Sequence, residues 1–280
     1  MLILRLKQSG FTLIEAIAVI IITAILGALA SSFSLPIKAY FAATARADLT
    51  DVADTAMRRM ARELHAALPN SVRVSGSYIE FLPTITGGRY RASAAVSGSA
   101  ICGGILAQDV LDFTSTDTCF EVIGGLSAST TFPVVNNELV VYNNDPSYVY
   151  NGTNVATIAS GTATNFVKFS TKQFPMPSPS QRFQIIDKPV SFVCEASSAT
   201  LWRYTGYARQ SAQPVSLATL NGLAGRTFSR LATGIDCTNS KFSYASGGTR
   251  RADLIVMKLS LTSGGNSVTL LHQVHVQNVP

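Results

Sequence analysis

The longest apolar run in the chain lies near its N-terminus, from Phe11 to Ala30. A helix over these residues is long enough to cross a hydrocarbon core about 30 Å thick. Arg5 and Lys7 precede the run, and this bias places the N-terminus in the cytoplasm. We therefore predict one membrane-spanning helix. Glu15 interrupts the run, and a lone carboxylate deep in lipid would cost about 2.5–3.5 kcal/mol.

A second helical pattern follows, in which apolar residues recur every three or four positions. These residues are Leu49, Ala53, Ala56, Met57, Met60, Leu64 and Leu68. They form one stripe that would pack against a sheet. We expect the helix to continue past Ala30, to be kinked or loosened at Pro36, and to end at Pro69-Asn70. The pattern predicts a membrane half over residues 11–35 and an amphipathic half over residues 36–69.

From Ser71 the pattern changes to short alternating or apolar runs between turn residues, which is typical of β-strands. The predicted strands cover residues 71–76, 78–83, 109–115, 137–144, 165–171, 181–187, 190–196, 199–208, 253–262 and 267–278. Residues 263–266, Ser-Gly-Gly-Asn, give the last two a strong hairpin signal. We expect a short helix within residues 214–225 and a rigid proline-rich loop at residues 174–181. The predicted fold class is α+β, with a long N-terminal helix packed on a β-rich, antiparallel domain over residues 70–280.

Composition and charge narrow the function. Only 14% of residues are charged, the net charge is +6, and no block of lysine and arginine occurs, so nucleic-acid binding is not expected. The four cysteines form no C-x-x-C motif and allow three disulfide pairings. We favour Cys102–Cys119 with Cys194–Cys237, because this pairing closes the shortest loops. The alternative is four free thiols, but an exported domain favours disulfides.

Three interpretations of the N-terminal segment compete. Ala28-Leu29-Ala30 is a cleavage pattern for an ordinary signal peptide. A plain single-pass anchor explains the length of the run and leaves Glu15 unpaired. The third interpretation rests on residues 10–15, Gly-Phe-Thr-Leu-Ile-Glu, which stand behind a short basic leader and open the apolar run. This combination resembles the class III signal of type IV pilins and of the pseudopilins of type II secretion.

The resemblance implies a specific maturation and a partner for the acid. In that family a membrane-bound prepilin peptidase cuts after the glycine and methylates the new N-terminus. The cut would lie between Gly10 and Phe11, and Phe11 would carry the methyl group. The family's glutamate pairs with the N-terminal amine of a neighbouring subunit, so Glu15 would set the register of assembly. Opposite charges near 4 Å attract by about 4 kcal/mol at an effective dielectric constant of 20, which is comparable with the cost of burying Glu15.

The resemblance continues beyond the signal. Residues 58–74, 87–91 and 270–280 resemble minor pilins of the mannose-sensitive haemagglutinin (MSHA) system, which are related to the J-type minor pseudopilins of type II secretion. It implies the pilin fold and a structural role, with no enzymatic activity and no cofactor. Expected partners are the prepilin peptidase, the major pilin, other minor pilins and the inner-membrane assembly platform. The subunit would lose a leader of residues 1–10, hold its globular domain in the periplasm, and then join the fibre, where minor subunits are thought to form a priming complex at the tip.

Other roles for the chain remain open alternatives. They are a type II secretion pseudopilin, a tip adhesin that binds a surface ligand, and an exported hydrolase with a cleaved signal. Three aromatic residues could form a sugar-binding platform: Trp202, Tyr204 and Tyr207. Burial in the core as part of a strand is the simpler interpretation of these residues. Three carboxylates could contribute to a calcium site: Asp109, Asp112 and Asp117. Their spacing, however, gives no loop with enough ligands for calcium.

The histidines give little support to metal binding or catalysis. His272 and His275 are three apart in a predicted strand, so their side chains should point to opposite faces. His65 lies near a predicted helix end, where the helix dipole favours it. No common nucleotide-binding, metalloprotease or esterase motif occurs in the sequence, and Asn151-Gly152-Thr153 indicates a turn rather than a glycosylation site. We predict no metal site and no catalytic residue.

Overall fold

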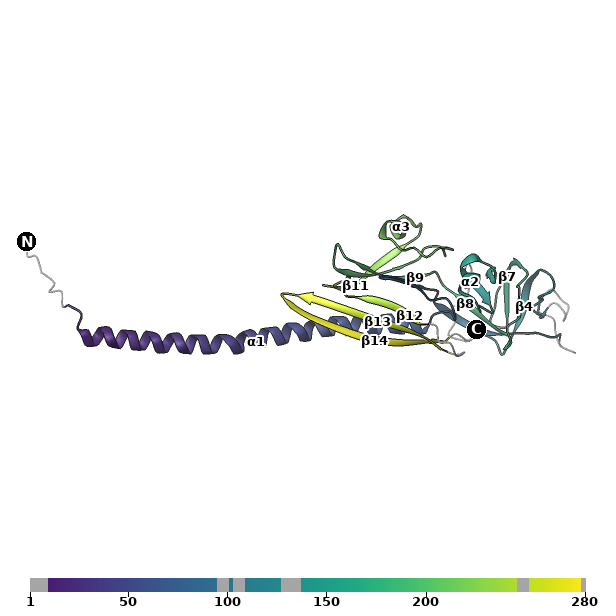
Figure 1. Ribbon diagram of the computed structural model, residues 1–280. Coiled ribbons are helices and arrows are strands. Elements are labelled where there is room, and N and C mark those ends of the chain that lie inside the picture. The colour runs from purple at the N-terminus through teal and green to yellow at the C-terminus, as the bar shows by residue number, and fades with distance from the viewer. Residues whose placement is uncertain (1–9, 95–100, 103–108, 127–136, 246–251, 278–280) are drawn as a thin grey trace, which may run out of the picture. The chain divides into compact units, whose positions relative to one another are not determined.

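The computed structural model of the protein describes residues 10–94, 101–102, 109–126, 137–245 and 252–277. The chain divides into two compact units, Met1–Asp48 and Leu49–Pro280. The long helix α1 (Leu13–His65), labelled in Figure 1, contributes to both units.

In the first unit α1 is continuous through Pro36. The helix therefore does not stop at the end of the apolar run, as the sequence predicted. Proline has no N–H, so the carbonyl four residues earlier, that of Ser32, loses its usual helical partner. A kink at Pro36 stays a prediction.

The second unit contains residues 49–65 of α1, the short helices α2 (Pro146–Asn151) and α3 (Leu217–Gly222), and antiparallel strands. The strands are β1 (Arg73–Ser75), β2 (Tyr78–Phe81), β3 (Thr84–Tyr90), β4 (Asp117–Ile123), β5 (Glu138–Val141), β6 (Val155–Thr157), β7 (Phe166–Lys172), β8 (Arg182–Ile186), β9 (Val190–Glu195), β10 (Thr200–Thr205), β11 (Thr227–Thr233), β12 (Lys241–Ala245), β13 (Ala252–Ser263) and β14 (Asn266–Gln277). The predicted α+β class is confirmed, with a long N-terminal helix followed by an antiparallel β domain.

The strands form three sheets in the described residues. Their orders are β1-β2-β9-β10-β11, β12-β13-β14 and β6-β5-β8-β3-β4-β7. The outer strands of the third sheet meet, because Ile158 forms a bridge with Phe169 and the N–H of Ala159 donates to the carbonyl of Lys168 at 2.9 Å. The third sheet is therefore closed into a barrel, which Figure 1 shows beyond the C-terminal end of α1.

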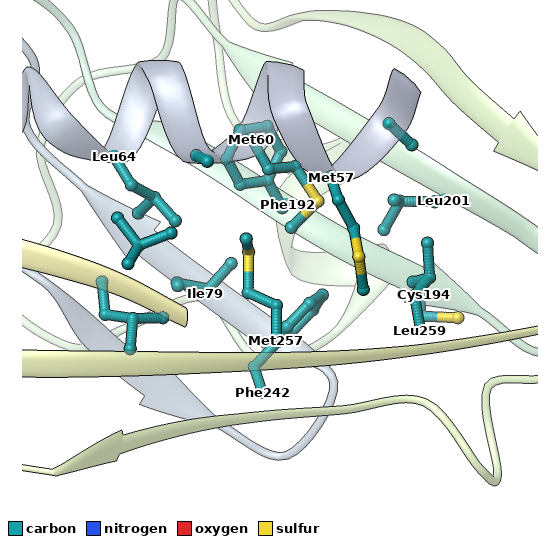
Figure 2. Packing of buried hydrophobic residues seen from close by; sticks show 14 of the residues in the cluster. Met57, Met60, Leu64, Ile79, Phe192, Cys194, Leu201, Phe242, Met257 and Leu259 are labelled. Atoms are coloured by element: carbon teal, nitrogen blue, oxygen red, sulfur yellow. The ribbon is translucent and has the colours of Figure 1, made fainter. Parts of the chain in front are cut away.

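One core joins the amphipathic part of α1 to the first two sheets. Figure 2 shows Met57, Met60 and Leu64 of α1 directed toward Phe192 of β9 and Met257 of β13. All these side chains are at most 3% exposed. From Leu49 to Leu64 the stripe of apolar residues is thus the face of α1 that packs on the sheets, as the helical spacing predicted. Leu68, the last predicted member, lies beyond the end of α1 and is buried in a different cluster.

The barrel has its own interior, lined by aromatic side chains. Phe120, Phe169, Phe174 and Phe183 are buried there, with the ring centroids of Phe120 and Phe183 5.0 Å apart. Gly87 of β3 lies so close to the barrel wall that a Cβ would sit 2.8 Å from the carbonyl oxygen of Phe183. Glycine in this strand therefore permits a close backbone approach.

Local bonds end α1 earlier than the sequence indicated. The helix ends at His65, not at Pro69. The N–H of Leu68 donates to the carbonyl of Leu82 at 2.7 Å, and the N–H of Thr84 donates to the carbonyl of Ala66 at 2.7 Å. These bonds draw the chain after His65 into an extended course beside β2 and β3.

The strand predicted at residues 109–115 is wrong. Its segment forms turns and bends, and the strand of this region is β4, a little later in the chain. The side chain of Asp112 accepts bonds from the N–H of Thr114 and the hydroxyl of Ser115. Such local bonds compete with a strand ladder. Leu111 is buried in the barrel core, which explains the apolar spacing.

Most other sequence predictions for this unit are confirmed. The hairpin β13–β14 pairs without interruption from Ala252↔Gln277 to Ser263↔Asn266. The short helix expected within residues 214–225 is α3, and residues 174–181 connect β7 to β8. Gly152 has a φ of 76° at the end of α2, so Asn151-Gly152-Thr153 is a turn. Five strands and α2 have no counterpart among the predicted elements: β3, β4, β6, β11, β12 and the helix Pro146–Asn151.

Candidate functional site

The start of α1 is held by reciprocal hydrogen bonds between Thr12 and Glu15. Thr12 precedes the first helical residue, so it is the N-cap, and Glu15 occupies the third helical position. The N–H and the hydroxyl of Thr12 each donate to Oε2 of Glu15 at 3.0 Å. The N–H of Glu15 donates to the hydroxyl oxygen of Thr12 at 3.4 Å. This arrangement is a capping box, and it satisfies donors that would otherwise lack partners at a helix start.

The capping box corrects the expectation that a plain anchor would leave Glu15 unpaired. One oxygen of the carboxylate is bonded within its own turn, and within the described residues the other oxygen, Oε1, accepts no hydrogen bond. The sequence already contained the pattern of a capping box, which is a threonine followed three residues later by a glutamate before an apolar run.

Gly10, Phe11 and Glu15 are all exposed in the single subunit, and the side chain of Phe11 is 78% exposed. The peptide bond between Gly10 and Phe11 lies outside the capping box. Cutting it would leave the bonds of Thr12 and Glu15 in place. Arg5 and Lys7, the basic residues of the leader, lie outside the described residues.

The apolar segment after the capping box is suited to lipid. Leu13–Ala30 has a mean hydropathy of 2.6, and none of its residues is buried within the subunit. Among the described residues it is the one helix long and apolar enough to span a membrane. A helix with apolar side chains on all sides and no protein cover belongs in a bilayer or against other helices.

The four cysteines form two disulfides in the globular unit. Cys102 is bonded to Cys119 with a Cα–Cα distance of 5.8 Å, and Cys194 is bonded to Cys237 with a Cα–Cα distance of 5.6 Å. This is the sequential pairing. The first disulfide fastens residues 101–102 to β4, and the second fastens β9 to the segment that follows β11.

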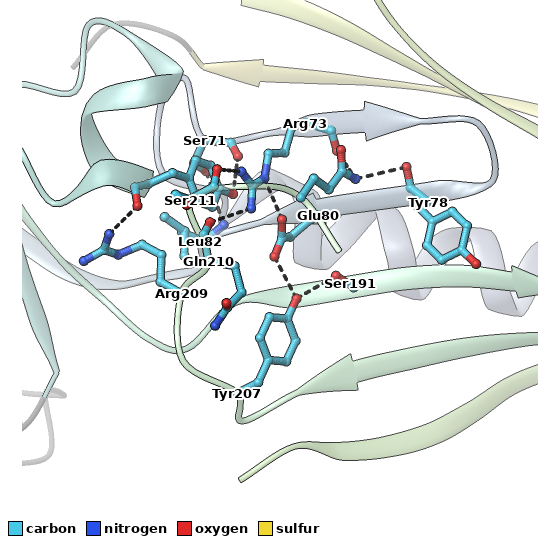
Figure 3. Close-up of polar contacts among 12 residues, drawn as sticks. Ser71, Arg73, Tyr78, Glu80, Leu82, Ser191, Tyr207, Arg209, Gln210 and Ser211 are labelled. Atoms are coloured by element: carbon cyan, nitrogen blue, oxygen red, sulfur yellow. Dashed lines mark hydrogen bonds and ion pairs between the residues drawn. The ribbon is translucent and has the colours of Figure 1, made fainter. Parts of the chain in front are cut away.

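A buried ion pair lies in the hairpin β1–β2, and sequence analysis missed it. Nε of Arg73 is 2.6 Å from Oε2 of Glu80, whose side chain is fully buried. The hydroxyl of Tyr207 donates to Oε1 of Glu80 at 2.9 Å, and Ser191 lies 2.6 Å from the same hydroxyl. Burial raises the pKa of Glu80 above its usual value, against the opposing effects of Arg73 and Tyr207. Figure 3 shows the group.

The same network connects the first sheet to the barrel. Arg73 donates to the carbonyl oxygens of Ser211 at 2.8 Å and Gln210 at 2.9 Å. From the same segment, Arg209 donates to both oxygens of Glu138 on β5, at 2.8 and 3.1 Å. Residues 207–211 therefore bridge two sheets through charged and polar groups. No pattern in the sequence predicts this contact, because its members are far apart in the chain.

The aromatic trio named in the sequence analysis does not form an open platform. Tyr207 is fully buried against Glu80, and Tyr204 is 4% exposed. Trp202 is partly buried, and its Nε1–H donates to Glu195 at 2.8 Å. Trp202 and Tyr204 both contact the exposed ring of Phe228. Their main role is packing on the outer side of the first sheet.

The three carboxylates considered for calcium accept hydrogen bonds from nearby groups instead. Asp109 accepts from the N–H groups of Ile101 and Cys102. Asp117 accepts from the N–H groups of Asp112, Thr118 and Cys119. In the part of the chain that the structure describes, no three histidine, cysteine or acidic side chains gather as a metal site would require.

The histidines are likewise separate. Val274 and Val276 of β14 face the core, so His272 lies on the inner face and His275 is exposed on the outer face. The prediction of opposite faces is confirmed. His65 lies in the last turn of α1, as expected from its position in the sequence.

Comparison with known proteins gives one match. Residues 5–31 match the family model of the prokaryotic N-terminal methylation motif. No curated protein and no solved structure matches the chain. The matched segment contains the basic leader residues, the capping box and most of the apolar helix. It implies processing by a prepilin peptidase and association with a membrane through that helix. The chain thus carries a type IV pilin-like prepilin signal, which indicates a pilin-like protein or a pseudopilin.

Proposed function

We propose that this chain is a minor pilin of an MSHA-type type IV pilus, where it helps to initiate or cap the fibre at its tip. The prepilin motif at residues 5–31 is the observation that carries the proposal. The resemblance of residues 58–74, 87–91 and 270–280 to MSHA minor pilins supports the choice of system.

The proposed maturation follows from the motif. The prepilin peptidase removes residues 1–10 and methylates Phe11. Residues 11–35 hold the subunit in the inner membrane, and the amphipathic part of the helix over residues 36–69 joins this anchor to a periplasmic domain over residues 70–280. The subunit later leaves the membrane for the fibre, where its role is structural.

In the proposed assembly step Glu15 binds the methylated amine of a neighbouring subunit. The capping box supports this role, because it holds Oε2 of Glu15 on Thr12 and leaves Oε1 available. An ammonium group 4 Å away would attract the carboxylate by about 4 kcal/mol at an effective dielectric constant of 20. The lone subunit in lipid lacks this partner, so docking into the fibre is favoured.

Mass spectrometry of the mature N-terminus tests the maturation. The expected terminus is N-methylated Phe11. A terminus at Ser31 would instead identify an ordinary signal peptide cut after Ala28-Leu29-Ala30, and the proposal would be wrong.

A matched pair of substitutions tests the role of Glu15. Glutamine can replace glutamate in a capping box, so Glu15→Gln keeps the local structure and removes the charge, whereas Glu15→Ala removes both. If the charge binds the amine, both variants are processed and inserted normally but neither enters the fibre. Fibre entry of the Gln variant at the wild-type level would show that Glu15 acts only as a helix cap. Thr12→Val retains the charge and should weaken entry to a smaller degree.

A pseudopilin of a type II secretion system is the second candidate, because the same motif indicates both classes. Deleting the gene in its own host separates them. Loss of surface fibres with normal secretion supports the pilus, and loss of secreted proteins with normal fibres supports the secretion system.

A further inference from the structure

Strand β14 presents a long edge that has no partner strand among the described residues. On one side it pairs with β13 in continuous register, without a bulge. It is the last strand of its sheet. On the other side, residues 267–277 form no hydrogen bond with any described residue. The backbone N–H and C=O groups along that side are therefore available for pairing.

The other sheet edges in the described residues are protected, and β14 is not. β1 is three residues long. β11 carries Arg230 and has a register shift against β10, β12 is short and begins with Lys241, and β6 and β7 meet in the barrel. β14 has twelve residues and contains no proline, glycine, lysine, arginine, aspartate or glutamate. Short length, charges and bulges are the usual means of blocking an edge, and β14 has none of them.

Several apolar side chains of β14 are only partly covered by the rest of the subunit. Val268 and Leu270 pack against the core formed with α1 but stay partly exposed, whereas Val274 and Val276 near the other end are buried. Leu271 on the outer face is 61% exposed. An added strand with apolar residues at alternate positions would cover this edge on both faces.

We propose that β14 is an interaction surface that accepts an antiparallel extended strand from a neighbouring, different pilin-like subunit. The inference rests on the proposed function, which supplies such neighbours. The edge carries no fixed charge, so backbone hydrogen bonds and alternating apolar contacts select the partner. The occupant is an uncharged strand of a length comparable with β14.

A second copy of this chain does not fit the same edge in the antiparallel direction. Two copies that pair β14 antiparallel to itself are related by a two-fold axis that reverses the strand direction. Residues 49–65 of α1 run in the same direction as β14 (Figure 1), so the axis would reverse them too. Subunits held in one membrane by equivalent apolar helices all point the same way. An antiparallel partner strand therefore comes from a different sequence.

Site-specific photocrosslinking of the full chain in its own host tests the proposal. A photoreactive residue replaces Thr269, Leu271 or Gln273 of β14, and Ser229 of β11 or Ile123 of β4 in the controls. All five positions are exposed. We expect the β14 probes to give adducts with another protein that carries a prepilin-type signal, identified by mass spectrometry, and the controls to give none with that protein. Adducts of the β14 probes only with a second copy of this chain would overturn the proposal.

Charge placed on the edge gives a second measurement. The Leu271→Lys/Gln273→Lys variant should lower co-purification of that subunit about tenfold or more, because lysine blocks strand addition. The Ser229→Lys/Thr233→Lys variant on the edge of β11 is the control and should have no effect. If pilin-like subunits co-purify with the wild-type chain but the β14 probes give no adduct and the lysines have no effect, strand pairing is wrong and the proposed function stands. If no pilin-like subunit co-purifies at all, the proposed function fails, and strand pairing fails with it.

Discussion

Two ion pairs of equal length but different burial provide a test of what stabilises the globular unit. Nε of Arg73 is 2.6 Å from Glu80, and Nε of Arg58 is 2.6 Å from Asp54. The side chains of the first pair are 17% and 0% exposed, and those of the second are 74% and 47% exposed. Glu80→Gln and Asp54→Asn each remove one charge with little change in shape, so burial is the main difference between the two experiments.

The expected losses of stability differ several-fold. Removing one partner of a buried ion pair costs about 3–5 kcal/mol. Arg73 keeps the carbonyl oxygens of Ser211 and Gln210 and the ring of Tyr150, 3.5 Å from its guanidinium carbon, so we expect the lower end, about 3 kcal/mol. An exposed i,i+4 pair contributes about 0.3–0.5 kcal/mol.

Thermal unfolding of the full chain in detergent, followed by circular dichroism with both disulfides intact, measures the difference. For a domain of this size each kcal/mol shifts the midpoint by about 2–4 °C. Glu80→Gln should therefore lower the midpoint by about 6–12 °C, and Asp54→Asn by about 1–2 °C. Equal shifts would refute the reasoning, because they would mean that the burial of Glu80 does not determine the cost of losing its charge.

Two further changes can be measured in the same assay. Serine replacement of both cysteines should cost about 4 kcal/mol for the Cys194–Cys237 disulfide and about 3 kcal/mol for the shorter loop of the other. Gly206→Ala should destabilise, since φ is +84° and the new Cβ would lie 2.6 Å from the carbonyl oxygen of Gly225, whereas Gly222→Ala meets open space and should not.

The elements predicted best are those whose signals are local and repeated. The apolar stripe of α1 extends over about four helical turns, and β13–β14 combines alternating residues with two glycines at the turn. Thr84–Tyr90 gave no strand signal, because Gly87 and Gly88 interrupt its alternation. Those glycines are required by the neighbouring barrel strand, whose backbone approaches Gly87 closely. This close approach joins segments that are far apart in the chain, so the alternation pattern alone could not predict β3.

The polar sites also differ in whether their members are close together in the sequence. The capping box of Thr12 and Glu15 lies within four residues, and the sequence contained its full pattern. Arg73 and Glu80 face each other only because the hairpin β1–β2 sets their register. Tyr207 arrives from a distant segment, which the sequence pattern assigned to a strand rather than to a bridge between sheets. Register and long-range contacts decide the buried network, and single-sequence patterns contain neither.

The two glutamates differ in how many of their carboxylate oxygens are bonded within the described residues. Both carboxylate oxygens of Glu80 are bonded, one to Arg73 and one to Tyr207, and all three groups belong to the same unit. Glu15 lies at the start of a lipid-suited helix, and one of its oxygens has no donor among the described residues. An acid in apolar surroundings is stable only when its bonding capacity is used. Among the described residues, both oxygens of Glu80 have donors and one oxygen of Glu15 has them. Under the proposed function, the second oxygen of Glu15 is the one that the amine of an adjoining subunit would bind.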